Sequence, residues 1–144
     1  MRELDEILKT RKKMRDIEIR IYELREIVRQ PKSQIISDMP RGGDRKNTIE
    51  EYIVKLERLE SKLHSLQKYI DEVWIGVEHI FDDCDIPIMH RKLMAFRFYD
   101  GNQWRKCVKL MAEKYHGVKW NENKLFRIYR NVLVKVNKTT KQSL

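Results

Sequence analysis

The chain has 144 residues, of which 37% are charged and 41% hydrophobic, with only five glycines and three prolines. This composition favours long helices over a β-sandwich, which would need many more turn residues. No apolar run approaches the roughly 20 residues that cross a bilayer, and the charged first residues do not resemble a signal peptide. We therefore expect a protein of the cytoplasm with no membrane segment.

Residues that could carry catalysis or bind a metal form no recognisable pattern. Cys84 and Cys107 belong to no CxxC pair, which predicts buried thiols rather than a disulfide framework or a zinc site. The acidic cluster Asp82, Asp83 and Asp85 is expected to end one helix and cap the next rather than to bind a divalent ion. No P-loop, GxSxG, HExxH or dinucleotide-binding motif is present. We therefore expect no enzyme, no cofactor and no metal.

The charge is distributed unevenly along the chain. Residues 1–85 carry 17 Lys and Arg against 19 Asp and Glu, whereas residues 86–144 carry 14 against 3, so the net charges are −2 and +11. A balanced half is typical of a salt-bridged helical rod. The basic half repels itself unless a polyanion relieves the repulsion, and nucleic acid is the commonest such partner. The alternative is a basic surface without a ligand.

Two long helices are predicted in the first half, over residues 2–30 and 48–81, because apolar residues recur there at heptad spacing. The first stripe consists of Ile7, Met14, Ile17, Ile21, Leu24 and Val28. The second fills five heptads with the pairs Ile49/Tyr52, Leu56/Leu59, Leu63/Leu66, Ile70/Val73 and Val77/Ile80. Thr48 and Glu51 have the spacing of a capping box at the start of the second helix.

The loop over residues 31–47 separates these helices, because Pro31, Pro40 and the pair Gly42-Gly43 interrupt both. We expect an antiparallel coiled-coil hairpin over residues 1–85. The heptads are compatible with a seam that closes within one chain or between two chains. A homodimer through the coiled coil would bury more of each seam, and we expect one.

The basic half, residues 86–144, is predicted to contain three short helices. Asp85 is expected near the N-cap of the first and Pro87 in its first turn. Its buried face would contain Met89, Leu93 and Phe96, and the pair Asp100-Gly101 would end it in a turn. Asn102 is then expected to cap the second helix.

The last two helices would form a helix-turn-helix with a long turn over residues 115–121. The buried face of the second helix is predicted to contain Trp104, Cys107, Val108, Met111 and Tyr115. Gly117 suits the left-handed position after that helix, and Asn121 suits the N-cap of the last one. The core stripe of the last helix would contain Leu125, Ile128, Tyr129, Val132 and Val136.

The polar face of the last helix is the predicted recognition surface. Arginine can donate two hydrogen bonds to guanine, and asparagine can pair similarly with adenine. The candidates for base contacts are Asn123, Lys124, Arg127, Arg130 and Asn131, with the N-terminal three favoured. The candidates for phosphate contacts are Arg105, Lys106, Lys109 and Lys119.

Aromatic residues are frequent in the same half and could form a stacking platform for single strands. They are Phe96, Phe98, Tyr99, Trp104, Tyr115 and Trp120. Because their spacing is helical and the domain is small, we interpret them as core.

Two short motifs resemble the ArpU/RinA-like transcriptional regulators of phages and prophages. One is the stretch from Ser37 to Gly43, with the sequence Ser-Asp-Met-Pro-Arg-Gly-Gly, ahead of a long heptad helix. The other is the stretch from Arg97 to Trp104, similar to the family's R-Y-x-x-G-x-x-W ahead of the helix-turn-helix. That helix-turn-helix is in turn similar to region four of bacterial sigma factors. The family's turn is usually shorter than residues 115–121.

The resemblance implies a phage-encoded activator of late genes for packaging and morphogenesis, which binds double-stranded promoter DNA and acts with host RNA polymerase. From sequence we therefore expect an all-α protein, with a coiled-coil hairpin over 1–85 and a basic helix-turn-helix domain over 86–144. Two alternatives remain open. One is a small terminase subunit, and the other is a coiled-coil adaptor whose basic domain binds an acidic protein.

Overall fold

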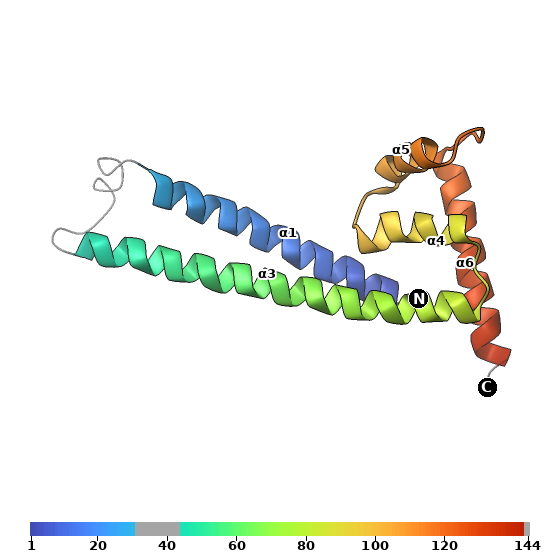
Figure 1. Cartoon of the computed structure of the whole chain (residues 1–144), viewed down its shortest axis with the longest axis horizontal. Helices are drawn as coiled ribbons and strands as arrows, with labels where there is room; N and C mark the ends of the chain where they lie inside the picture. The colour runs from blue at the N-terminus through green and yellow to red at the C-terminus, as the bar shows by residue number, and fades with distance from the viewer. Residues whose placement is uncertain (31–43, 143–144) are drawn as a thin grey trace. The chain divides into compact units, whose positions relative to one another are not determined.

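The structure is a computed structural model that describes residues 1–30 and 44–142, with side chains over 1–30 and 48–140. Within these residues every regular element is helical, so the all-α prediction is confirmed (Figure 1). The elements are α1 (Arg2–Arg29), α3 (Asp44–Asp83), α4 (Ile88–Met94), η1 (Ala95–Tyr99), α5 (Trp104–Lys114) and α6 (Glu122–Gln142). No helix in the described part of the chain is long and apolar enough to cross a membrane.

The chain folds into two compact units. One unit contains residues 1–9 together with the chain from Ile70 onward, and the other is Thr10–Tyr69. Both α1 and α3 run through the two units. The ends of these long helices, residues 2–9 and 70–83, thus belong to the same unit as α4, η1, α5 and α6.

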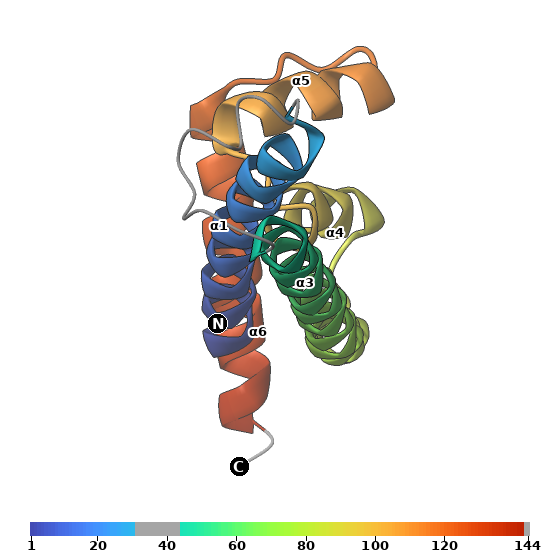
Figure 2. The ribbon, with the colours of Figure 1, turned by 90° about the vertical axis from the view of Figure 1, so that its left-hand side faces the viewer.

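Within Thr10–Tyr69, α1 and α3 lie side by side and run in opposite directions (Figures 1 and 2). Two hydrogen bonds between the helices show this direction. Arg11 Nη1 donates to Gln67 Oε1 at 2.9 Å, and Arg25 Nη2 donates to Glu60 Oε1 at 2.7 Å. A residue early in α1 is therefore paired with one late in α3.

The apolar heptad stripes are the covered faces of these two helices. On α1, Met14, Ile21 and Leu24 are buried and Ile17 is half-buried. On α3 the stripe is half-buried at Ile49, Tyr52, Leu56, Leu59, Leu63 and Leu66. Two helices share only one seam, so each can cover only part of the other's stripe.

The start of the second long helix differs from the prediction. α3 begins at Asp44, so Thr48 and Glu51 lie inside the helix and cannot form the capping box at its N-terminus. The last four residues of the predicted loop, 44–47, are thus helical. The rest of that loop, including its prolines and glycines and the whole stretch from Ser37 to Gly43, lies outside the described residues.

The end of α3 is closed by a Schellman motif. The backbone N–H of Ile86 donates to Phe81 O at 3.1 Å, and the N–H of Asp85 donates to Asp82 O at 3.2 Å. Asp85 has a φ of 53°, and both Phe81 and Ile86 are buried. The prediction that the acidic cluster ends one helix is therefore confirmed at Asp85, whereas the prediction that it caps the next helix is wrong. Asp85 ends α3, and Pro87 is the N-cap residue of α4.

Replacing Asp85 with glycine is expected to stabilise the protein by about 1 kcal/mol, because glycine adopts the left-handed conformation without a steric cost. Urea unfolding followed by circular dichroism measures this change. Asp85→Ala is the matched control, since it removes the carboxylate but keeps the Cβ, and we expect it to leave stability nearly unchanged. A gain in Asp85→Ala equal to that in Asp85→Gly would contradict the conformational explanation.

A π-helical turn changes the buried face after α4. In η1 the backbone N–H of Asp100 donates to Ala95 O at 2.9 Å, five residues back. This wider turn shifts the inward-facing register. The buried residues are Leu93, Met94 and Phe98, whereas Met89 and Phe96 are only half-buried. Of the predicted face, only Leu93 is thus fully buried.

Candidate nucleic-acid interface

Helices α5 and α6 contact each other through the faces that the sequence predicts. The buried residues of these faces are Cys107, Met111, Leu125, Ile128, Val132 and Val136. Trp104, Val108, Tyr115 and Tyr129 complete them as half-buried residues. These two core stripes are confirmed. The opposite faces of both helices, where the charged candidates lie, are consequently open to solvent.

An aromatic cluster fixes the start of α5 against α6. The Trp104 ring lies 5.2 Å from Phe126 and 5.5 Å from Tyr129 on α6, and 6.2 Å from Phe98 in η1. The Arg97 guanidinium lies over the Trp104 ring at 5.2 Å. These rings are packed in the fold, as the core interpretation predicted, and they do not form an open stacking platform.

The second resemblance motif forms the turn that leads into α5. Gly101 has a φ of 76°, and the Asn102 side-chain amide donates to Phe96 O at 3.0 Å. Arg97 Nη1 donates to the carbonyl of Asn102 at 3.0 Å. The prediction that Asn102 caps α5 is wrong, because Gln103 is the N-cap residue and Asn102 instead closes the preceding turn. The residues of this motif position α5 and leave its charged face free.

The connection between α5 and α6 spans residues 115–121 and is internally packed. Gly117 has a φ of 83°, in agreement with the predicted left-handed position. Trp120 Nε1 donates to Tyr115 O at 3.0 Å, and the two rings are 6.4 Å apart. Asn121 Oδ1 accepts a hydrogen bond from the backbone N–H of Lys124 at 2.8 Å, so the predicted cap of α6 is confirmed.

The structure leaves four of the five base-contact candidates exposed on α6, namely Asn123, Arg127, Arg130 and Asn131. The fifth, Lys124, is half-buried with its Nζ 4.9 Å from the centre of the Trp120 ring. Val134 is 51% exposed and at helical spacing falls on the same face. The exposed polar surface of α6 therefore begins at its first turn and includes one apolar residue.

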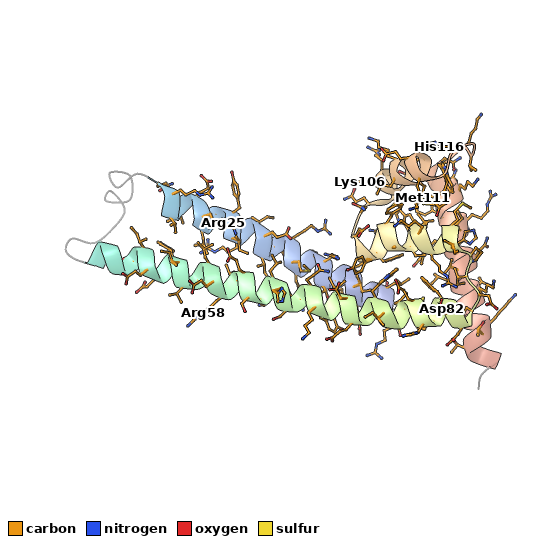
Figure 3. All side chains as sticks on the ribbon, viewed as in Figure 1. Arg25, Arg58, Asp82, Lys106, Met111 and His116 are labelled. Carbon is orange, nitrogen blue, oxygen red and sulfur yellow. The ribbon has the colours of Figure 1, made fainter. Side chains whose placement is uncertain are left out.

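Three of the four phosphate-contact candidates come together on α5. Arg105, Lys106 and Lys109 are exposed and, with Gln103, line a hollow of about 410 Å³. Figure 3 labels Lys106 on this surface and the buried Met111 on the same helix. Lys119 is exposed in the connection to α6 and does not line this hollow. Gln103 is the one lining residue that the sequence reasoning missed.

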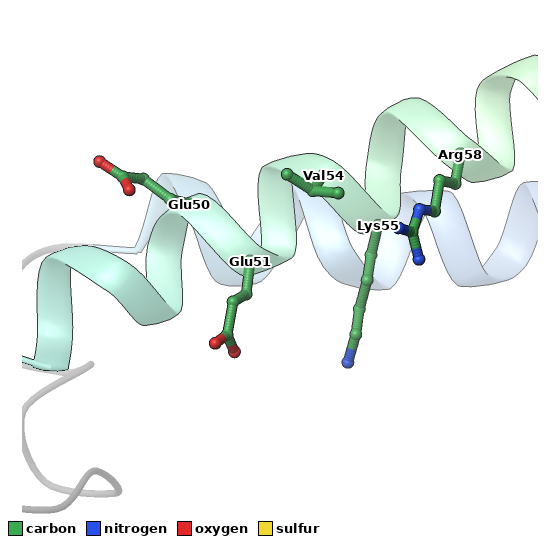
Figure 4. Close-up of a pocket in the computed structure, with 5 residues that line it drawn as sticks. All are labelled: Glu50, Glu51, Val54, Lys55 and Arg58. Carbon is green, nitrogen blue, oxygen red and sulfur yellow. The ribbon is translucent and has the colours of Figure 1, made fainter.

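The cations of this surface lack acidic partners. Between residues 86 and 140, Arg91 is the only cation that forms an ion pair, with Asp82. The exposed cations of α5 and α6 therefore keep their charge available for an anion. A second hollow, of about 550 Å³ on α3, is different because Glu50 and Glu51 balance Lys55 and Arg58 there (Figure 4). The unbalanced positive charge makes the exposed faces of α5 and α6 the candidate surface for binding an anion.

Chemistry at the thiols is disfavoured by burial. Cys84 and Cys107 are both buried and unbonded to each other. Burial raises the pKa of Cys107 to about 11, so its thiol stays protonated at neutral pH. Among the residues that the structure describes, no three His, Cys, Asp or Glu side chains gather as a metal site.

No protein-family model, no curated protein and no solved structure matches this chain.

Proposed function

We propose that the chain is a phage-encoded regulator of transcription that binds double-stranded DNA in a sequence-specific manner through α5 and α6. In this proposal α5 and α6 are a helix-turn-helix, with α6 in the major groove and α5 against the phosphates. The observation that carries the proposal is the pairing of an exposed Arg and Asn face on α6 with unpaired cations on the contacting helix α5.

The chemistry of the two helices supports separate roles. Arg127 and Asn123 are exposed one turn apart near the start of α6, where side chains of a recognition helix reach base edges. Arg105, Lys106 and Lys109 present charge without a rigid partner, which suits contacts to phosphate oxygens. The +11 charge of residues 86–144 favours such a partner.

The remaining parts of the proposal rest on the helix pattern and on the family resemblance. We propose that α1 and α3 act as a coiled-coil hairpin, and that the half-buried stripe of α3 contributes to a homodimer. The resemblance implies activation of late genes with host RNA polymerase, in the cytoplasm of the bacterial host. A small terminase subunit would also bind DNA, but we expect it to act in packaging and not to alter transcription from a promoter.

Two alanine variants separate base contacts from phosphate contacts. The duplex for the test is first selected by binding from a random pool. Arg127→Ala is expected to lower affinity for the selected duplex by about 1–3 kcal/mol, with a much smaller effect on a scrambled duplex. Lys109→Ala should weaken both duplexes about equally and reduce the salt slope by roughly one unit.

Titrations at several salt concentrations also test the proposal as a whole. With about five to eight phosphate contacts, the logarithm of affinity should fall against the logarithm of salt with a slope of about −4 to −7. An equal loss on both duplexes in Arg127→Ala would remove that residue from base recognition. A flat salt dependence, together with capture of a protein from nuclease-treated extract, would favour the adaptor function instead.

A further inference from the structure

A second surface of the same compact unit has a different chemistry from the proposed DNA site. It is a groove of about 310 Å³ where the end of α3, α4 and the end of α5 meet. Trp74 and Phe81 of α3 and Ala95 of η1 contribute apolar atoms to it. The groove is therefore formed by residues that are far apart in the chain and that share one compact unit.

Ile88 is one of the residues that line this groove, and it is 80% exposed. No other large hydrophobic side chain in the described residues is as exposed, and Ile88 lines the groove together with the buried Trp74 and Phe81. Scattered exposed apolar residues are normal, but one that continues an apolar floor is typical of a docking surface. The floor can therefore receive an apolar side chain from a partner.

The rim of the groove is positively charged. Arg91, Lys92 and Lys114 line it, together with the single acid Glu78. Glu78 already accepts a hydrogen bond from Trp74 Nε1 at 2.9 Å. Arg91 is held in place by its bonds to the carbonyls of Phe81 and Ile86 and by Asp82. Lys114 is exposed and forms no ion pair, so the rim keeps a net positive charge.

We propose that this groove docks an acidic segment of a partner protein, which inserts one large apolar side chain over Ile88 and Trp74 and places its carboxylates against Lys92 and Lys114. The complementary charge selects an acidic partner, and the apolar floor selects a protein over a nucleic acid. This inference goes beyond DNA binding and does not depend on it, because the groove shares no residue with the proposed DNA contacts.

The test uses the full chain and two fluorescent synthetic peptides, with anisotropy as the measurement. In one peptide Asp and Glu alternate with Leu and Phe, and in the other the Leu and Phe are replaced by Ser. Ile88→Asp and Lys114→Glu change the groove. Val118→Asp and Lys138→Glu are the matched controls, since they make the same changes in charge at exposed positions outside it.

The expected result is that both groove variants bind the apolar acidic peptide at least about tenfold more weakly than the wild type, whereas both controls stay within about twofold. The serine peptide should bind weakly to every variant. Asp is well tolerated at the first position of a helix, so Ile88→Asp should keep the helical signal. Lys114→Glu changes a solvent-exposed side chain, so it tests the charged rim separately from the apolar floor that Ile88→Asp tests.

Three results would overturn the inference. The first is equal affinity of the wild type and both groove variants for the apolar acidic peptide. The second is equally tight binding of the serine peptide, which would reduce the interaction to charge alone. The third is a loss of duplex DNA affinity in Ile88→Asp that exceeds the loss in Val118→Asp, which would place nucleic acid in the groove. Failure of DNA binding in the wild type would leave the peptide result unaffected.

Discussion

A fragment of residues 86–144 is expected to be largely unfolded, although it contains all of the excess positive charge. The compact unit that holds α4, α5 and α6 also contains residues 1–9 and 70–85. These two segments contribute the buried residues Leu4, Ile7, Ile70, Trp74, Val77, Phe81 and Cys84. The truncated fragment would expose the surfaces that these side chains cover.

The size of this effect follows from the burial of large apolar side chains. Each fully buried Leu, Ile, Val or Phe contributes about 1.5–3 kcal/mol, whereas a whole domain is stable by only about 5–15 kcal/mol. The truncation removes five such side chains, namely Leu4, Ile7, Ile70, Val77 and Phe81. The burial free energy lost with them is therefore as large as the stability of a whole domain. We expect a weak helical signal, no cooperative urea transition and no sequence-specific DNA binding.

A fragment of residues 70–144 is the control for truncation at residue 85. It regains Trp74, Val77 and Phe81 while still lacking residues 1–9, so it should be more helical than fragment 86–144 and less stable than the full chain. Circular dichroism and urea unfolding at equal concentration compare the three proteins. A cooperative transition in fragment 86–144 at the same urea concentration as in the full chain would contradict this expectation.

Replacement of Trp104 by alanine is expected to cost about 3 kcal/mol of folding stability. The indole contacts rings on both η1 and α6, and the Arg97 guanidinium lies over it. Its removal would leave Phe98, Phe126 and Tyr129 without a common neighbour. Because these contacts hold the start of α5 against α6, we expect the proposed DNA binding to weaken together with stability.

Two further variants test this explanation. Trp104→Phe keeps an aromatic ring and should recover more than half of the lost stability and DNA affinity. Trp120→Ala removes an indole that contacts Tyr115 within the connecting segment, and we expect its effect on stability to be clearly smaller. Urea unfolding is followed by circular dichroism, because each of these variants lacks a tryptophan and its fluorescence cannot be compared with that of the wild type. Equal destabilisation by Trp104→Ala and Trp120→Ala would contradict the claim that the cluster around Trp104 contributes more to folding stability than the contact of Trp120.

Helical periodicity alone determined several features of this protein. The buried stripes of α5 and α6, the cap formed by Asn121 and the left-handed Gly117 were all predictable, because each depends on residues within a few positions of one another. The exposed face of α6 follows from the same argument, since the side opposite a buried stripe is solvated. The helical pattern alone therefore predicted which polar residues of α6 are exposed, namely Asn123, Arg127, Arg130 and Asn131.

Tertiary structure decided the features that depend on distant partners. The π-helical turn at residues 95–99 moved Phe98 into the core in place of Phe96, which no regular helical period anticipates. Asp85 adopts a left-handed conformation because burial of Phe81 and Ile86 closes the end of α3. The heptads likewise could not show that residues 2–9 and 70–83 belong to the same compact unit as α5 and α6. A local pattern specifies which side of a helix is apolar, whereas only the folded chain specifies what covers that side.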